Sequence, residues 1–297
     1  MRIGLALPQY GEFADTATSL KVAVEAERLG YDSLWVSDRM LLPTHPRDRY
    51  PSHDGVVPPE YTRFLDPLVV LTAAATVTSK ARLGTSTLNA LWHPPALLAR
   101  TLTTIDQLSG GRLDVGIGLG WSRDEYEAAG VPWGGRGARL DETLDVLKAV
   151  WTGDPVAHNG KLWTVPESVV DVKPVQRPHP PVLLAAFTPR GLARIARKAD
   201  GWLGVGLPLP LLTQTVNALK QMAGDRALRM PTRVNPVLTD EPVDPRQVPI
   251  RGTVGQIADY LVRAGEVVDE VLIDLQLTAT SEQHLVDLAG EFAGRLR

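Results

Sequence analysis

The stretch RLDVGIGLGW (112–121) decides the fold, and it continues through SRDEYEAAGVPWGG (122–135) into RGARLDETLDVLKAVW (136–151). In residues 113–119, branched apolar side chains alternate with aspartate and glycine, which is the two-residue period of a strand. One face of this strand is bulky, and the other narrows to glycine. Residues 136–151 space their leucines three to four apart, which is typical of an amphipathic helix packed on a sheet.

Runs typical of strands alternate with runs typical of helices along nearly the whole chain. The predicted strands are residues 3–7, 33–37, 81–86, 113–119, 182–186, 202–205, 233–238 and 270–275. The predicted helices are residues 16–29, 67–78, 93–111, 136–151, 189–199, 211–223, 254–264 and 282–296. Repeated strand–helix units indicate an α/β fold, a (β/α)8 TIM barrel with insertion loops. We expect a single domain over residues 1–297, with a long loop at 38–64 and a hairpin within 153–181.

Composition and charge exclude several function classes. The chain has 297 residues, of which 44% are hydrophobic, and a formal net charge of −3, so we expect neither a nucleic-acid partner nor a membrane span. It has no cysteine, which excludes disulfides and a thiol nucleophile. We expect no metal site either, because the histidines are scattered; His45 and His53, with Asp48 and Asp54, are interpreted as loop residues. The start enters a strand directly, without an export signal, which predicts a cytoplasmic location.

Small residues occupy one face of four predicted strands. The pairs are Gly4 and Ala6, Gly84 and Ser86, Gly116 and Gly118, and Gly204 and Gly206. We expect these faces to point inward near the mouth of the barrel and to leave space for a flat ligand. The alternative is that they let the helices approach the sheet closely.

Residues just after the strands of an α/β barrel form its active site. The candidates are Asp38, Arg39, Thr87, Asn89, Trp92, His93, Gly118, Gly120, Trp121, Ser122, Phe187, Thr188, Pro189 and Arg190. Thr188 can cap a helix that begins at Pro189, and free N–H groups at such an end suit phosphate; the alternative is an ordinary capped helix. His93 lies where a proton donor would be useful, or is a packed loop residue. A Rossmann fingerprint is disfavoured, because its third glycine would have to be Trp121.

The chain resembles the bacterial luciferase-like monooxygenase superfamily. The carrying motifs are AERLGYDSLWVSDRM (26–40), ARLGTSTLN (81–89), LARTLTTIDQLSGGRLDVGIGLGWSRDEYEAAGVPW (98–133), RLDETLDVLKAVWTGDP (139–155) and PVLLAAFTPRGLARIARKADGWLGVG (181–206). The resemblance covers nearly the whole chain and implies the same barrel. It also implies a homodimer.

Within the superfamily, the chain is most similar to the branch that uses the deazaflavin coenzyme F420. The resemblance implies that Asp38 contacts the deazaflavin, that Ser86–Thr87 is a cis peptide that backs the ring, and that Asn89 contacts the ring or tail. It further implies that Gly118 and Gly120 allow close approach, and that Phe187–Thr188, followed by Pro189 and Arg190, forms the phosphate turn. Luciferase-type FMN binders place an arginine where this chain has Leu119.

The chain departs from the sugar-phosphate-oxidising members, because Arg39 and Trp121 stand where those proteins have histidine and glutamate. We therefore expect an F420-dependent oxidoreductase that transfers a hydride to or from a small organic substrate. Arg39 would stabilise developing charge, His93 would exchange a proton, and Trp121 would form an apolar wall. The alternatives are an FMN-dependent two-component monooxygenase that uses reduced flavin and oxygen, and a flavin-binding relative without catalysis.

Overall fold

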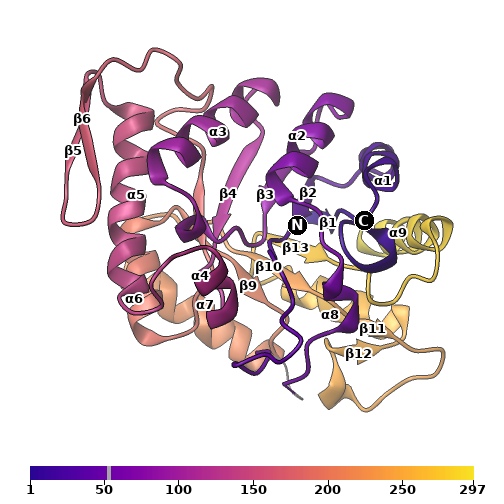
Figure 1. Cartoon of the computed structure of the whole chain (residues 1–297). Coiled ribbons are helices and arrows are strands. Elements are labelled where there is room, and N and C mark those ends of the chain that lie inside the picture. The colour runs from indigo at the N-terminus through magenta and orange to yellow at the C-terminus, as the bar shows by residue number, and fades with distance from the viewer. Residues whose placement is uncertain (52–54) are drawn as a thin grey trace.

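A closed ring of parallel strands forms the centre of the computed structural model, which describes residues 1–51 and 55–297 (Figure 1). The nine strands are β1 (Arg2–Ala6), β2 (Ser33–Val36), β3 (Arg82–Thr85), β4 (Leu113–Ile117), β7 (Val182–Leu184), β8 (Gly201–Trp202), β9 (Gly204–Val205), β10 (Pro231–Val234) and β13 (Glu270–Ile273). Their order is β8-β7-β4-β3-β2-β1-β13-β10-β9.

The predicted strand at residues 202–205 is broken into β8 and β9. β8 pairs with β7, and β9 pairs with β10, both in parallel. Because only Leu203 separates β8 from β9 in the chain, this broken strand joins the two ends of the sheet and closes the ring. The predicted (β/α)8 barrel is therefore confirmed, with one of its strands interrupted.

Helices cover the outside of the barrel (Figure 1). They are α1 (Thr16–Leu29), α2 (Pro67–Val77), α3 (Pro95–Leu108), α4 (Arg123–Ala128), α5 (Arg136–Thr152), α6 (Pro189–Lys198), α7 (Leu209–Ala223), α8 (Val254–Ala264) and α9 (Glu282–Leu296). Local signals set their ends: the Asp15 side chain accepts from the Thr18 amide at the start of α1, and Gly30 ends it at φ 92°. The long helices lie within two residues of their predicted bounds or inside them.

Short strands and 3-10 turns lie outside the ring of strands. β5 (Val156–Asn159) and β6 (Thr164–Ser168) form an antiparallel hairpin beside α5, as expected for residues 153–181 (Figure 1). β11 (Val237–Leu238) and β12 (Arg251–Gly252) form a small parallel pair. The 3-10 turns are η1 (Gly11–Phe13), η2 (Pro59–Thr62), η3 (Ala90–Trp92) and η4 (Pro245–Gln247).

Two inner glycines of the strands, Gly4 and Gly84, make room for the side chain of Trp35. A Cβ at Gly84 would lie 2.4 Å from the Trp35 ring, and one at Gly4 would lie 2.9 Å from Trp35 Nε1. Trp35 is fully buried in a small inner cluster with Leu203 and two further leucines. The expectation that the small faces leave space for a flat ligand is therefore wrong at Gly4 and Gly84, where Trp35 fills the space. Ser86 and Gly204, nearer the mouth, do line a cavity.

Ion pairs close the amino-terminal end of the barrel. Asp114 of β4 is fully buried and accepts from Arg82 Nε at 2.8 Å and from Arg229 Nη1 at 2.6 Å. Glu270 of β13 is equally buried and accepts from Trp35 Nε1 at 3.0 Å. Burial raises the pKa of Glu270. The base is therefore filled, and any ligand must lie at the opposite end of the barrel.

Candidate active site

A cavity of about 320 Å³ lies at the carboxyl-terminal mouth of the barrel. Its lining comes from the segments after β2, β3, β4, β7 and β10, and from β9 with Leu203 before it, as expected for a site on this fold. Five aromatic side chains line it, namely Tyr50, Tyr61, Phe64, Trp92 and Trp121. Smaller or polar groups line the rest, including Ser86, Thr87, Ala185, Gly204, Arg233 and Asn235. The volume suits a small-molecule ligand.

Eight of the candidate residues line this cavity together: Asp38, Arg39, Ser86, Thr87, Asn89, Trp92, Gly120 and Trp121. Gly120 has φ +64°, and a Cβ there would lie 2.8 Å from Asn89 Nδ2, so both backbone conformation and space favour glycine. Gly118 is not among the lining residues. A Cβ at Gly118 would instead lie 2.4 Å from Thr87 Oγ1, so this glycine supports the packing of Thr87.

The peptide bond between Ser86 and Thr87 is cis, as the resemblance implied. The Ser86 carbonyl accepts a hydrogen bond from Arg233 Nη1 at 2.7 Å, and the Ser86 amide donates to the Val36 carbonyl at 2.6 Å. Arg233 also forms a buried ion pair with Asp274. This peptide is thereby fixed at the edge of the cavity from two sides.

Sequence reasoning missed Arg233. It lies on β10 within PTRV, and its Nε donates to Asn235 Oδ1 at 3.1 Å. Its partner Asp274 also accepts from the Tyr10 hydroxyl at 2.9 Å. Asp274 is 1% exposed and does not line the cavity, so it fills the barrel beneath it. An arginine inside an apolar strand indicates that it needs a buried anion if it turns inward, but the sequence does not show that it does so.

Asp38 lies directly after β2, and its Oδ2 accepts from the Asn89 amide at 2.9 Å. Burial raises the pKa of Asp38 to about 7, and the carboxylates of Glu125 and Asp66 add to this shift. The Asn89 hydrogen bond and the Arg39 charge oppose it. Asp38 can therefore exist in both protonation states near neutral pH, which suits a group that exchanges a proton.

Arg39 and Trp121 are in contact at the rim of the cavity. The Arg39 guanidinium carbon lies 4.8 Å from the Trp121 ring centroid and 5.3 Å from that of Tyr61. Arg39 Nη1 lies 3.8 Å from Glu125 Oε2, while the other oxygen of Glu125 accepts from the Met40 amide at 2.8 Å. The structure thus brings together two of the three predicted catalytic residues.

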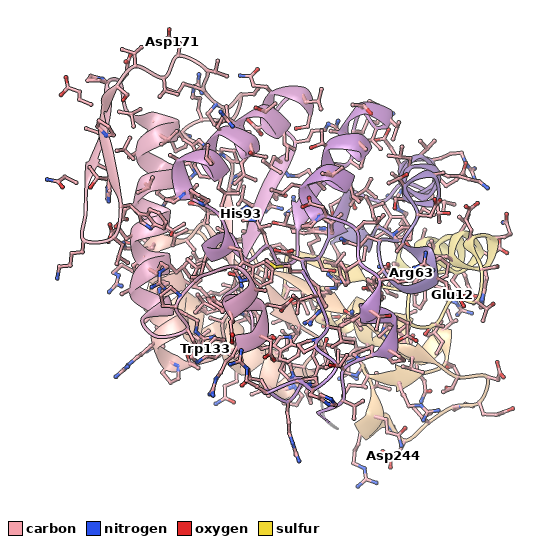
Figure 2. All side chains as sticks on the ribbon, in the orientation of Figure 1. Glu12, Arg63, His93, Trp133, Asp171 and Asp244 are labelled. Atoms are coloured by element: carbon pink, nitrogen blue, oxygen red, sulfur yellow. The ribbon has the colours of Figure 1, made fainter. Side chains whose placement is uncertain are left out.

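The third, His93, lies outside the main cavity. It lines a neighbouring cavity of about 260 Å³ to which Asp38, Arg39 and Trp92 also contribute. His93 lies two residues before α3, and Figure 2 shows it near the middle of the molecule. Burial lowers the pKa of His93, which favours the neutral ring. It is separated from the main cavity by residues that line both cavities, and its proton-donor role remains a prediction.

The predicted phosphate turn is exposed beside the cavity. Phe187 is 50% exposed and packs its ring edge on Trp202, with centroids 6.0 Å apart. The Thr188 side chain accepts from the Gly191 amide at 3.2 Å, so it caps α6 as predicted, with Pro189 in the first turn. None of residues 187–190 lines the cavity, although Ala185 just before them does. The turn is placed to contact only a ligand that extends out of the mouth.

The insertion loop, residues 37–66, of which the structure describes 37–51 and 55–66, lines one side of the mouth and is tied to α4. Arg47 pairs with Asp124 at 2.5 Å and with Glu127 at 2.5 Å, and Asp48 pairs with Arg123 at 3.4 Å. The acids of the first turn of α4, Asp124 and Glu125, are favourable at a helix N-terminus and also bind this loop. Tyr50 of the loop contacts Trp121 edge-on at 5.3 Å.

Metal binding and membrane insertion have no support in the residues that the structure describes. Residues 1–51 and 55–297 contain no cluster of three or more metal-binding side chains. His53 and Asp54, which sequence analysis considered with His45 and Asp48, lie outside the described residues. None of the described helices is both long and apolar enough to span a bilayer.

The sequence profile of the luciferase-like monooxygenase family matches residues 2–241. The chain belongs to this family. Uncharacterized proteins of Mycobacterium bovis and Mycobacterium tuberculosis are 40% identical to it over 181 residues, which cover 60% of this chain and 64% of theirs. The match thus spans less than two thirds of the length of these relatives.

Solved structures of low identity share the fold. Monooxygenase RslO1 from Streptomyces bottropensis has a TM-score of 0.81 and 22% identity, with 100% of this chain and 98% of that chain covered. An F420-dependent secondary alcohol dehydrogenase in complex with an F420–acetone adduct has a TM-score of 0.77 and 18% identity, with 100% and 99% covered. At these identities the likeness establishes the luciferase-like barrel alone.

Proposed function

We propose that this protein is an oxidoreductase that uses coenzyme F420 and acts on a small organic substrate in the cavity at the mouth of its barrel. The observation that carries the proposal is the group of residues around Ser86–Thr87. Asp38, Asn89 and Gly120 surround the same cavity as this peptide, and each was assigned to the cofactor from the resemblance alone. The F420-dependent alcohol dehydrogenase with the same fold supports the choice of cofactor.

The residues present fit a flat ring with a long anionic tail. Beside the Ser86–Thr87 peptide the cavity is lined by small groups, including Ala185 and Gly204, which leave space for a ring. The Phe187–Arg190 turn lies next to Ala185, outside the cavity and at the start of α6, where amide groups and Arg190 suit the phosphate of a tail. Leu119, in the position where FMN binders have arginine, packs against the hydrophobic core and offers no charge.

The chain's own residues orient and shield the reactants. When bound, the deazaflavin supplies the hydride chemistry, and the protein supplies position and electrostatics. Arg233 and the Val36 carbonyl hold the Ser86–Thr87 backbone in place. Asp38 holds or releases a proton at its carboxyl oxygen near neutral pH. Tyr50 and Trp121 exclude water from the rim.

An FMN-dependent monooxygenase is the second candidate. It is favoured by membership of the luciferase-like monooxygenase family and by the shared fold with the monooxygenase RslO1, at a TM-score of 0.81. The two candidates differ in the cofactor that the same cavity takes, so a binding experiment separates them without knowledge of the substrate.

The test is titration of the purified chain with oxidised F420 and, separately, with FMN, followed by the absorbance and fluorescence of each cofactor. We expect F420 to bind with a micromolar Kd and FMN to bind at least about tenfold more weakly, because this chain has Leu119 where FMN binders have an arginine. Micromolar FMN binding without F420 binding would reverse the assignment in favour of the monooxygenase.

A pair of arginine variants tests the tail site. Arg190→Ala removes a cation from the first turn of α6, and we expect it to weaken F420 binding about tenfold at low salt. Arg197→Ala is the matched control, because Arg197 is an exposed arginine in the last turn of the same helix. Equal effects of the two variants would place the tail elsewhere.

A further inference from the structure

The guanidinium of Arg39 is a charged group of the cavity that the proposed function leaves unexplained. The Arg39 side chain is 6% exposed, and its Nη1 makes no hydrogen bond to any residue that the structure describes. Its ion-pair partner, Glu125 Oε2, lies at 3.8 Å, which is beyond hydrogen-bonding distance. Buried donors in folded proteins are nearly always satisfied, so this one indicates a ligand atom that accepts from it.

Aromatic rings fix the position of that donor. The guanidinium lies over Trp121 on one side and near Tyr61 on another, at 4.8 and 5.3 Å from the ring centroids. Tyr50 joins the two rings, because its hydroxyl is 3.2 Å from the Tyr61 hydroxyl and its ring contacts Trp121 edge-on. All four side chains line the main cavity. A ligand that reaches Arg39 therefore lies against flat apolar surfaces.

The charge balance around Arg39 selects the kind of acceptor. The guanidinium is already paired with the Glu125 carboxylate, and Asp38 is its neighbour in the chain and in the cavity lining. A carboxylate or phosphate ligand would add a further negative charge next to Glu125 and Asp38, which is unfavourable in a buried site. A carbonyl oxygen accepts the hydrogen bond without adding charge.

We propose that the cavity takes a neutral, flat cyclic or aromatic ketone or aldehyde, whose carbonyl oxygen accepts from Arg39 while its ring lies against Trp121. The proposal rests on the proposed function, since it names the substrate class of the same site. It makes Arg39 the residue that separates carbonyl compounds from hydrocarbons of the same shape, and Glu125 the residue that rejects acids.

Three probes of similar shape test the class: acetophenone, ethylbenzene and benzoate. Their Kd values for the full chain are measured by ligand-observed NMR titration, with and without F420. We expect acetophenone to bind about tenfold more tightly than ethylbenzene, because a hydrogen bond to a charged donor is worth about that factor. We expect benzoate to bind no more tightly than ethylbenzene. Equal binding of acetophenone and ethylbenzene, or tightest binding of benzoate, would overturn the proposal.

Two substitutions assign the effect to residues. Arg39→Met keeps an apolar side chain of similar length, and we expect it to abolish the preference for acetophenone while leaving ethylbenzene binding unchanged. Glu125→Gln keeps an acceptor for the Met40 amide but leaves Arg39 with a net positive charge. We expect it to raise benzoate affinity about tenfold. An unchanged preference in Arg39→Met, or unchanged benzoate affinity in Glu125→Gln, contradicts the assignment.

Two controls keep the test decisive. Near-ultraviolet circular dichroism shows whether each variant is folded, and if Arg39→Met is not, the Glu125→Gln result decides alone. F420 binding is read separately from its own absorbance. If the unmutated chain binds F420 but shows no preference for acetophenone, the substrate class is rejected and the proposed function stands. If it prefers acetophenone but does not bind F420, the cofactor is rejected.

Discussion

Single residues at the mouth were predictable where they follow a strand. Asp38, Arg39, Asn89 and Trp121 were assigned to the mouth because barrel strands end there, and all four line the cavity. Arg233 and Glu125 were not found, because the sequence does not show which charged side chain of a strand or helix turns inward. Only the pairing of Arg233 with Asp274, which lies 41 residues further along the chain and directly after β13, reveals its position.

Asp38 gives a pH-dependent prediction at this scale. Because its folded pKa is raised to about 7, the folded chain keeps a proton that the unfolded chain releases near pH 4, so this contribution to stability is present in acid and is lost as pH rises through 7. We expect the free energy of unfolding of Asp38→Asn, measured relative to that of the wild type, to be about 2–4 kcal/mol higher at pH 8 than at pH 5. Urea unfolding at both pH values measures this.

The contrary result for Asp38 is easily recognised. If the difference in unfolding free energy between Asp38→Asn and the wild type is the same at pH 5 and pH 8, the Asp38 carboxyl does not titrate in this range. Its part as a proton-exchanging group would then have to pass to another residue of the site.

Helices and strands followed the sequence closely where local signals were strong. α1 spans its predicted residues because Asp15 caps its start and Gly30 ends it in the left-handed region. The break between β8 and β9 was missed, because Trp202, Leu203 and Gly204 have the composition of one continuous strand. Leu203 turns into the barrel and packs on Trp35 in the inner cluster, which is a tertiary contact that no local pattern encodes.

The insertion loop contacts the segment after β4, and a substitution in the loop tests whether this contact closes the mouth. Tyr50 contacts Trp121, so it helps to hold the loop against the segment after β4. We expect Tyr50→Ala to open the mouth and to increase the quenching of tryptophan fluorescence by acrylamide. Tyr50→Phe is the matched control, because it keeps the ring and loses only the hydroxyl contact with Tyr61. Identical quenching in the two variants would mean that the ring contact does not close the mouth.

For the whole molecule, the barrel separates stability from activity by location. The alternation of strand and helix patterns predicted this architecture, since eight such units close most readily as a parallel ring. Residues that stabilise the fold lie at the filled base around Asp114, and residues of the candidate site lie at the open mouth around Ser86. The sequence could not show that Trp35 fills the inner space, because a tryptophan in a buried strand has no pattern of its own.

A substitution at the base of the barrel should lower stability without changing cofactor binding. Asp114 is fully buried between Arg82 and Arg229, so Asp114→Asn leaves two cations without a counter-charge. We expect a loss of about 2–4 kcal/mol in unfolding free energy, reduced from the fully buried case because both arginines are partly exposed. F420 affinity should not change, because the site lies at the other end.

Urea unfolding and F420 titration of the same preparation measure both effects of Asp114→Asn. Asp145→Asn is the control, because Asp145 pairs with Lys198 at the surface and its side chain is 50% exposed. We expect this exposed pair to change stability by less than about 1 kcal/mol. A comparable loss in both variants, or a weakened F420 affinity in Asp114→Asn, would contradict the separation.

Trp35 and the ion pairs beneath it have a consequence for traffic through the molecule. Because the described residues fill the amino-terminal end of the barrel, two ligands that share the cavity both enter and leave through the mouth. The ligand that lies deeper then binds first and dissociates last. An excess of the outer ligand therefore slows the dissociation of the inner one. We therefore expect turnover to fall at high concentrations of the outer ligand, which is substrate inhibition.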